Sequence, residues 1–274
     1  MKFQLKTTIA VLALTTFFVS CSSDDDTAPV TEGTTGDAEL FFDNGVAGDA
    51  LILGNTYTNS NGENLTIDRL NYVVSNIVFI KEDGSEYAYP KEQSYFIISQ
   101  EANMHTVHLE ALPVGDYKKV RLGIGVDKER YLQGETAQQS FWDLAVANNM
   151  TWTWSTGYRF INFEGSFTSA TVSEPAIFQV HQGSNSATDN YREITLNLPT
   201  TARVRENEMP SIHIKADANV ILDGTNKIIL GNNLNGTGTA ASVMGGQNLI
   251  DVAANTLNMF TVDHVHNGAG SHHE

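Results

Sequence analysis

The sequence has few cysteines and few cations, and both shortages narrow what the protein can be. Cys21 is the single cysteine among 274 residues, so the chain has no disulfide of its own and depends on an apolar core for stability. Lys and Arg number 16 against 32 Asp and Glu. Because such an acidic surface repels a phosphate backbone, we do not expect nucleic acid as a partner.

Motifs of the common enzyme classes are also missing. The chain has no G-x-S-x-G nucleophile elbow, no phosphate-binding P-loop, no dinucleotide glycine fingerprint and no H-E-x-x-H zinc helix. Its many carboxylates leave a two-carboxylate hydrolase as a distant alternative, since linear sequence does not show their separation. We therefore expect a binding protein rather than an enzyme.

The N-terminal segment is typical of a lipoprotein signal peptide. Lys2 and Lys6 precede a short apolar run, and Ser20 directly precedes Cys21. The run is shorter than the roughly 20 apolar residues that a membrane-spanning helix needs. We predict a signal peptide over residues 1–20 and a lipid anchor on Cys21; a buried or free cysteine is the alternative. The mature protein would then be anchored to a membrane, in the periplasm or on the outer face of the outer membrane.

The remaining chain divides into a tether, a domain and a tail. Residues 21–37 are polar and acidic, which indicates a flexible tether. From residue 38 onward, short apolar segments alternate with Gly, Asn and Asp, the pattern of an all-β domain. We predict one antiparallel two-sheet β-sandwich over residues 38–266, with one or two short helices near residues 140–149 and 249–257. Residues 267–274 are predicted to be a flexible tail.

Eight histidines stand out in so acidic a chain. In an extended strand, Phe260, Val262, His264 and His266 would share one face, and the H-x-H spacing of the two histidines can chelate a metal ion. Met259 is close enough to be a soft ligand for copper(I). Ordinary strand histidines and a core methionine are the alternative interpretation.

Two other histidines and two tryptophans lie in further predicted strands. His181 closes one strand, and His213 lies on the polar face of another, where a surface histidine is the default interpretation. Trp152 and Trp154 share a strand face. Two large aromatic side chains on one face are usually core, and an aromatic wall beside a metal ion is the functional alternative.

Several segments resemble the MbnP-like family of exported, copper-associated β-sandwich proteins, in its lipoprotein branch. The block W-T-W-x-x-G-Y is the most specific of them. The matching stretches are Phe41–Asp43, Leu65–Asn76, Pro113–Tyr117, Leu122–Asp127, Trp152–Phe160 and Phe178–Gly183, with Met259–His266 similar to the C-terminal end of many lipoprotein members.

This resemblance implies a protein that binds or handles copper outside the cytoplasm. It places His181 at the family's histidine position in F-x-x-H-x-G, with His264 and His266 as the next expected ligands and His213 after them. Asn44 stands where some members carry a histidine, so this chain lacks that ligand. We expect an exported copper-binding lipoprotein, with an envelope transporter as a candidate partner; a metal-free binding module on the cell surface is the alternative.

Overall fold

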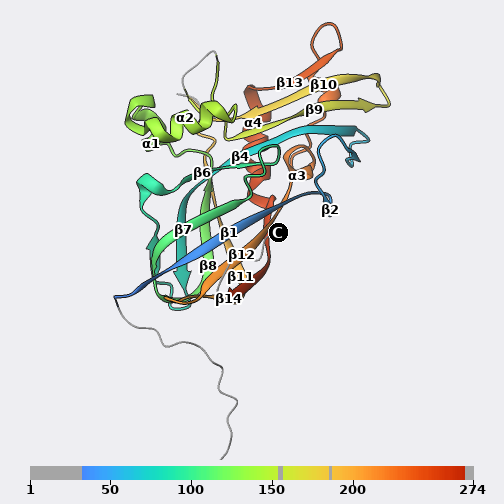
Figure 1. Ribbon diagram of the computed structural model, residues 1–274. Helices are drawn as coiled ribbons and strands as arrows, with labels where there is room; N and C mark the ends of the chain where they lie inside the picture. Colours follow the sequence, from blue (N-terminus) through green and yellow to red (C-terminus); the bar gives the residue numbers. More distant parts are fainter. Residues whose placement is uncertain (1–32, 154–156, 185–186, 269–274) are drawn as a thin grey trace, which may run out of the picture.

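Alternating apolar residues build two facing β-sheets in a computed structural model that describes residues 33–153, 157–184 and 187–268 (Figure 1). Within these residues the smaller sheet has five strands: β1 (Thr35–Val46), β2 (Asp49–Ala50), β7 (Thr106–Pro113), β12 (Met209–Asp217) and β14 (Phe260–Gly268). The larger sheet has nine: β3 (Thr56–Thr58), β4 (Asn64–Lys81), β5 (Glu86–Ala88), β6 (Tyr95–Ser99), β8 (Gly115–Ile124), β9 (Ile161–Ser169), β10 (Val172–Gln182), β11 (Arg192–Val204) and β13 (Ala240–Val243).

The predicted two-sheet β-sandwich is confirmed, but its sheets are mixed rather than purely antiparallel. β1 runs parallel to β12, and β10 runs parallel to β13, while the other pairs between named strands are antiparallel. Parallel neighbours need a long crossover connection, and β1 and β12 are indeed far apart in the chain. Residue alternation reports which face is buried and carries no information on strand direction, so the sequence did not reveal these two pairs.

A shared apolar core joins the two sheets. In β1, Ala38, Leu40 and Phe42 alternate toward the interior and are fully buried. The Phe42 ring lies 6.0 Å from Tyr72 of β4 and 6.3 Å from Phe260 of β14, and Tyr72 lies 5.5 Å from Phe260, all in edge-to-face contacts. These contacts fix the start of β14 against both sheets, because edge-to-face packing adds to the burial of large rings.

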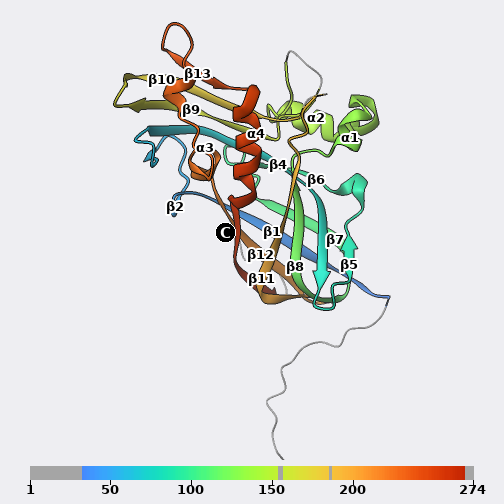
Figure 2. The ribbon, with the colours of Figure 1, turned by 180° about the vertical axis from the view of Figure 1, so that it is seen from behind.

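Short helices lie at the edges of the sandwich, with α4 beside β9 and β10 in Figures 1 and 2. The two helices predicted near residues 140–149 and 249–257 are present as α2 and α4. No described helix is long and apolar enough to cross a membrane. The helices are α1 (Lys128–Leu132), α2 (Gln139–Ala147), α3 (Asn219–Asp223) and α4 (Gly246–Asn255), with 3-10 turns at Lys91–Gln93, Glu135–Gln138, Leu230–Asn233 and Thr256–Asn258.

The domain begins at Thr35, three residues earlier than the predicted boundary, because β1 extends back to pair with β7. Thr35 lies opposite Pro113, and the Val114 amide donates to the Thr34 carbonyl at 3.2 Å. The chain therefore enters the sandwich beside the β7–β8 turn, at the lower end in Figure 2. The predicted anchor, Cys21, and the predicted tail lie outside the described residues.

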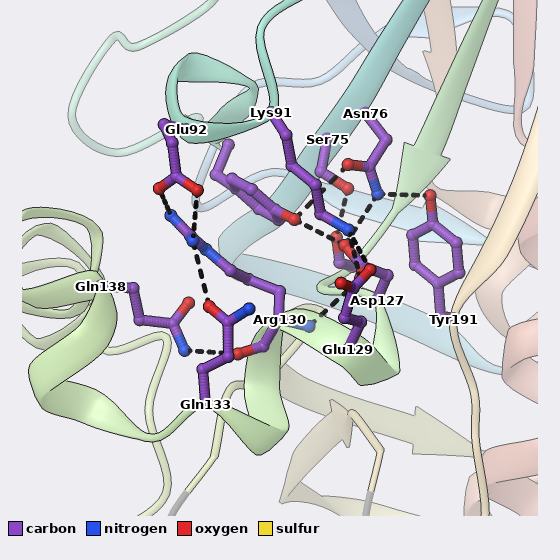
Figure 3. Close-up of polar contacts among 12 residues, drawn as sticks. Ser75, Asn76, Lys91, Glu92, Asp127, Glu129, Arg130, Gln133, Gln138 and Tyr191 are labelled. Atoms are coloured by element: carbon purple, nitrogen blue, oxygen red, sulfur yellow. Dashed lines mark hydrogen bonds and ion pairs between the residues drawn. The ribbon is translucent and has the colours of Figure 1, made fainter.

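A polar network fastens α1 to the larger sheet and joins two of the motifs singled out in the sequence (Figure 3). Ser75 donates to the Gly125 carbonyl at 2.7 Å, and the Asn76 amide donates to Asp127 at 2.9 Å. The Tyr95 hydroxyl donates to the same carboxylate at 2.5 Å. The ends of the 65–76 and 122–127 motifs thus meet at one carboxylate. The polar residues at these two ends therefore have a structural role.

Asp127 also forms the N-cap of α1, since its side chain accepts a hydrogen bond from the Arg130 amide. Burial alone would raise the pKa of Asp127, but hydrogen bonds from Asn76, Tyr95 and Lys91 hold that pKa below its usual value. The carboxylate is therefore ionised at neutral pH and accepts several hydrogen bonds at once.

Replacing this acceptor tests the network. We expect Asp127→Ala to lower the free energy of unfolding by about 2–3 kcal/mol, because it removes a helix cap and leaves half-buried donors unpaired. Glu129→Ala is the matched control: its exposed carboxylate also contacts Lys91 but should contribute less than about 1 kcal/mol. Urea denaturation measures both, and equal losses in the two variants would contradict the central role of Asp127.

Candidate metal centre

The outer face of the smaller sheet carries three histidines from two neighbouring strands. In β12, Ile212 and Ile214 are buried, so His213 between them faces outward. His213 lies directly opposite His264 of β14, and Ser211 lies opposite His266. Antiparallel pairing therefore brings all three imidazoles onto one surface.

A β-bulge in β14 sets this orientation. His213 pairs with His264 while the next residue, Ile214, pairs with Val262, so Asp263 is an extra residue in β14. Before the bulge Phe260 and Val262 pack against the core; after it, Val265 is buried and the two histidines point outward. The expectation that Phe260, Val262 and both histidines share one face is therefore wrong, because strict alternation ends at the bulge.

The three imidazoles are close enough to form one cluster. One ligand nitrogen from each ring lies within 4.8 Å of the others. The rings of His213 and His264 are stacked with centroids 4.0 Å apart, and His266 meets them edge-on at 5.4 Å and 4.7 Å. Two nitrogens bound to one ion lie at most about 4 Å apart, so closing the cluster takes side-chain rotations of about 1 Å. His213 and His264 are half-buried and His266 is exposed, which leaves the site open on one side.

Asp263, the bulge residue, orients one of the three rings. The Nδ1 atom of His264 lies 2.8 Å from an Asp263 oxygen, and the other carboxylate oxygen accepts from Lys215 at 2.7 Å. Hydrogen bonds from Lys215 and His264 hold the pKa of Asp263 below its usual value. An ionised Asp263 makes His264 Nδ1 the donor and leaves Nε2 as the lone-pair nitrogen, the arrangement common to metal-binding histidines.

A buried carboxylate lies next to the cluster on the same face. Glu39 of β1 has no exposed surface, accepts a hydrogen bond from Ser211 at 3.0 Å, and lies 3.3 Å from His108 Nδ1. Four residues on adjacent strands lie opposite one another and form one row across the sheet: His266, Ser211, Glu39 and His108. Phe41, in the next row, packs against His213 with ring centroids 5.2 Å apart. The cluster therefore has an apolar neighbour on β1, and a buried carboxyl group lies in the same row as His266.

His181 belongs to a different site, in the larger sheet. It is 3 % exposed, and its Nε2 lies 2.5 Å from Glu164, which also pairs with Arg69 at 2.6 Å. Burial lowers the pKa of His181, while the hydrogen bond from His181 and the nearby Arg69 outweigh burial and lower the pKa of Glu164. The pair is thus a neutral imidazole donating to a carboxylate, and Nδ1 of His181 is buried with no hydrogen-bond partner.

The other predicted site residues lie apart from the three-histidine cluster. Trp152 lies against His181, with ring centroids 6.1 Å apart, and the Arg159 guanidinium covers it at 5.4 Å. Trp154 lies outside the described residues. Met259 is 1 % exposed and packs in the core. Asn44 is buried and bonded to Tyr72 and Gln100, on the opposite face of the smaller sheet from the histidines.

The comparison with protein families agrees with the motifs. A family model described as MbnP matches residues 35–244, most of the chain. The chain belongs to the MbnP family. The match includes His181 and His213, whereas His264 and His266 lie beyond its end. MbnP proteins are associated with copper, and imidazole is a ligand type that suits copper.

A solved structure gives a second comparison. MbnP from Methylosinus trichosporium is similar over 86 % of this chain and 99 % of its own, with 12 % sequence identity and a TM-score of 0.44. No functionally curated protein matches the chain.

The sequence did not reveal Asp263, Glu39 or Glu164 as neighbours of histidines. Asp263 adjoins His264 in the sequence, and this adjacency was the available signal. Glu164 and His181 are brought together by the antiparallel pairing of β9 with β10, and Glu39 reaches Ser211 through the parallel β1–β12 pair. Both contacts depend on strand register, which the sequence does not display.

The environment of His181 predicts how stability depends on pH. Its pKa is lower in the folded chain than in the unfolded chain, so the unfolded chain binds the proton first and stability falls as the pH drops. Between about pH 7.5 and 5.5, around the usual histidine pKa, His181→Gln should lose less stability than the unmodified chain. Chemical denaturation at several pH values measures this difference. An unchanged pH dependence in His181→Gln would contradict the assignment.

Proposed function

We propose that this chain is an exported lipoprotein that binds copper at the cell envelope, with copper held by His213, His264 and His266. The observation that carries the proposal is the convergence of three imidazole nitrogens within 4.8 Å. Membership of a copper-associated family supports copper as the metal. The N-terminal signal and Cys21 support a place outside the cytoplasm.

Three features make this cluster the preferred copper site. Neutral imidazole binds copper in both oxidation states, and the acidic surroundings favour a cation. Asp263 already accepts a hydrogen bond from His264 Nδ1, so Nε2 of this ring carries the lone pair that a metal ion needs. The open side of the cluster leaves room for a further ligand or for a partner that delivers or receives the metal.

His181 is the weaker candidate because its environment is closed. Its Nε2 is engaged by Glu164, so only the buried Nδ1 could bind a metal without breaking that contact. Histidines are not otherwise gathered around it, since the donor group found among the described residues contains His213, His264 and His266. The protein on this proposal binds and hands on a metal ion and performs no catalytic step.

Copper titration by competition with a chromogenic chelator tests both the metal and the site. The mature chain, from residue 21, should bind one copper ion, and His264→Ala/His266→Ala should weaken binding by more than about 100-fold, since two of three ligands are lost. His108→Ala is the matched control on the same sheet face and should bind normally. If His181→Gln abolishes binding and the double variant does not, the site assignment is wrong. If the unmodified chain binds no copper, a metal-free binding module becomes the better interpretation.

The orienting role of Asp263 gives a separate prediction. Asp263→Ala should weaken copper binding about tenfold, because the acceptor that fixes the His264 tautomer is lost. Asp263→Asn keeps an oxygen acceptor and should recover part of the affinity. Asp43→Ala removes another exposed carboxylate from the same face, and equal weakening by this control would show a general charge effect rather than orientation.

A further inference from the structure

The larger sheet carries a pocket whose charge is opposite to that of the protein. The pocket has a volume of about 340 Å³ and is lined by strands β4, β8 and β11 and the turn after β4. Three lysines, Lys81, Lys118 and Lys119, and one carboxylate, Glu82, contribute to its walls. Without the basic residues of the signal peptide the chain has a formal charge of −18, from 14 cations and 32 anions, so such a local excess of cations is unusual.

Unlike most cations of the described part of the domain, these lysines form no ion pair there, although the charge of Lys81 acts on the nearby Asp83. Arg69, Lys91 and Arg130, for example, all form ion pairs. Among the described ion pairs, none involves Lys81, Lys118 or Lys119. The Lys81 ammonium instead lies 5.8 Å from the centre of the Tyr117 ring. The charges of Lys118 and Lys119 are therefore the ones available to a ligand.

Irregular strand pairing places Lys118 and Lys119 on one face, whereas Lys81 lies on the side of Tyr117. On β4, Ile80 pairs with Lys119 and Lys81 pairs with Tyr117, so Lys118 is an extra residue in β8. The pairing of β8 with β11 shifts at the same place, between Asn197 and Ala202. Because a bulge interrupts alternation, the consecutive Lys118 and Lys119 can both face outward while Tyr117 stays buried.

The pocket lies near the end of the sandwich where the chain enters. Thr35 pairs with Pro113, and the Tyr117 hydroxyl donates to the Pro113 carbonyl at 2.8 Å, so β1 begins beside the start of β8. Figures 1 and 2 both show β1 starting at the lower end of the sandwich. The predicted anchor, Cys21, precedes Thr35 by 14 residues, which span at most about 50 Å.

We propose that Lys118 and Lys119, in the wall of this pocket, bind the phosphate groups of anionic lipid headgroups and hold this end of the domain against the membrane. The tether predicted from the sequence would not by itself fix the orientation of the domain. The acidic remainder of the surface is repelled by an anionic membrane, while Lys118 and Lys119, which form no ion pair among the described residues, are attracted to it. The Asn197 amide in the pocket wall adds a hydrogen-bond donor for a phosphate oxygen.

Vesicle co-sedimentation tests the proposal on the mature chain with Cys21→Ser, so that no lipid anchor contributes. The chain should bind vesicles of phosphatidylcholine with phosphatidylglycerol and not vesicles of phosphatidylcholine alone, and added salt should weaken binding. Lys118→Gln/Lys119→Gln should reduce binding about tenfold or more. Lys128→Gln, which removes another lysine without a described ion pair, should change it little.

Several outcomes would overturn the assignment. These are no binding to anionic vesicles, equal binding to neutral ones, or a loss in Lys128→Gln equal to that in the double variant. Titration with inorganic phosphate distinguishes binding of free phosphate from binding of lipid phosphate groups. Saturable phosphate binding that depends on Lys118 and Lys119, without vesicle binding, would show a site for free phosphate and contradict the lipid assignment. Copper binding is measured independently, so failure here leaves the proposed function untouched.

Discussion

The β-bulge at Asp263 is the constraint on which the candidate metal centre depends. Phe260 must point inward, because its ring packs against Phe42 and Tyr72 between the two sheets. With strict alternation from Phe260, His264 and His266 would also point into the core, where two polar rings would need buried partners. One extra residue turns them outward instead, opposite His213. The same residue supplies the carboxylate that orients His264. One local irregularity therefore turns both histidines outward and fixes the tautomer of His264.

The two histidine environments show how burial divides structural from binding roles. His181 is enclosed, neutral and committed to Glu164, which is itself tied to Arg69. Removing any one member leaves a buried group unpaired, the usual behaviour of a polar network that stabilises a fold. The imidazoles of His213, His264 and His266 are close together but partly exposed, so a metal ion in solution could reach them. A site that binds and releases a metal needs this second kind of environment.

The sequence predicted the face of each strand better than the partners of that strand. Alternation around Ile212 and Ile214 placed His213 on the outer face, and the H-x-H spacing placed His264 and His266 together. It did not place these two strands side by side, and it grouped His181 with His264 and His266 through family resemblance. His181 lies in the larger sheet because the β9–β10 hairpin belongs there. Strand order, bulges and parallel pairing arise from long-range packing, which a periodic pattern of apolar residues does not encode.

Two bulges, in different sheets, place imidazoles on one face of the domain and lysines on another. The bulge in β14 presents imidazoles on the smaller sheet, and the bulge in β8 presents Lys118 and Lys119 on the larger one. Cations repel metal ions, so lysines beside the imidazoles would oppose metal binding; on that face Lys215 is instead neutralised by Asp263. Lys118 and Lys119 lie on the other sheet, so the membrane contact proposed for that sheet would leave the histidine face open to solvent. The two proposed sites are therefore compatible in one acidic domain.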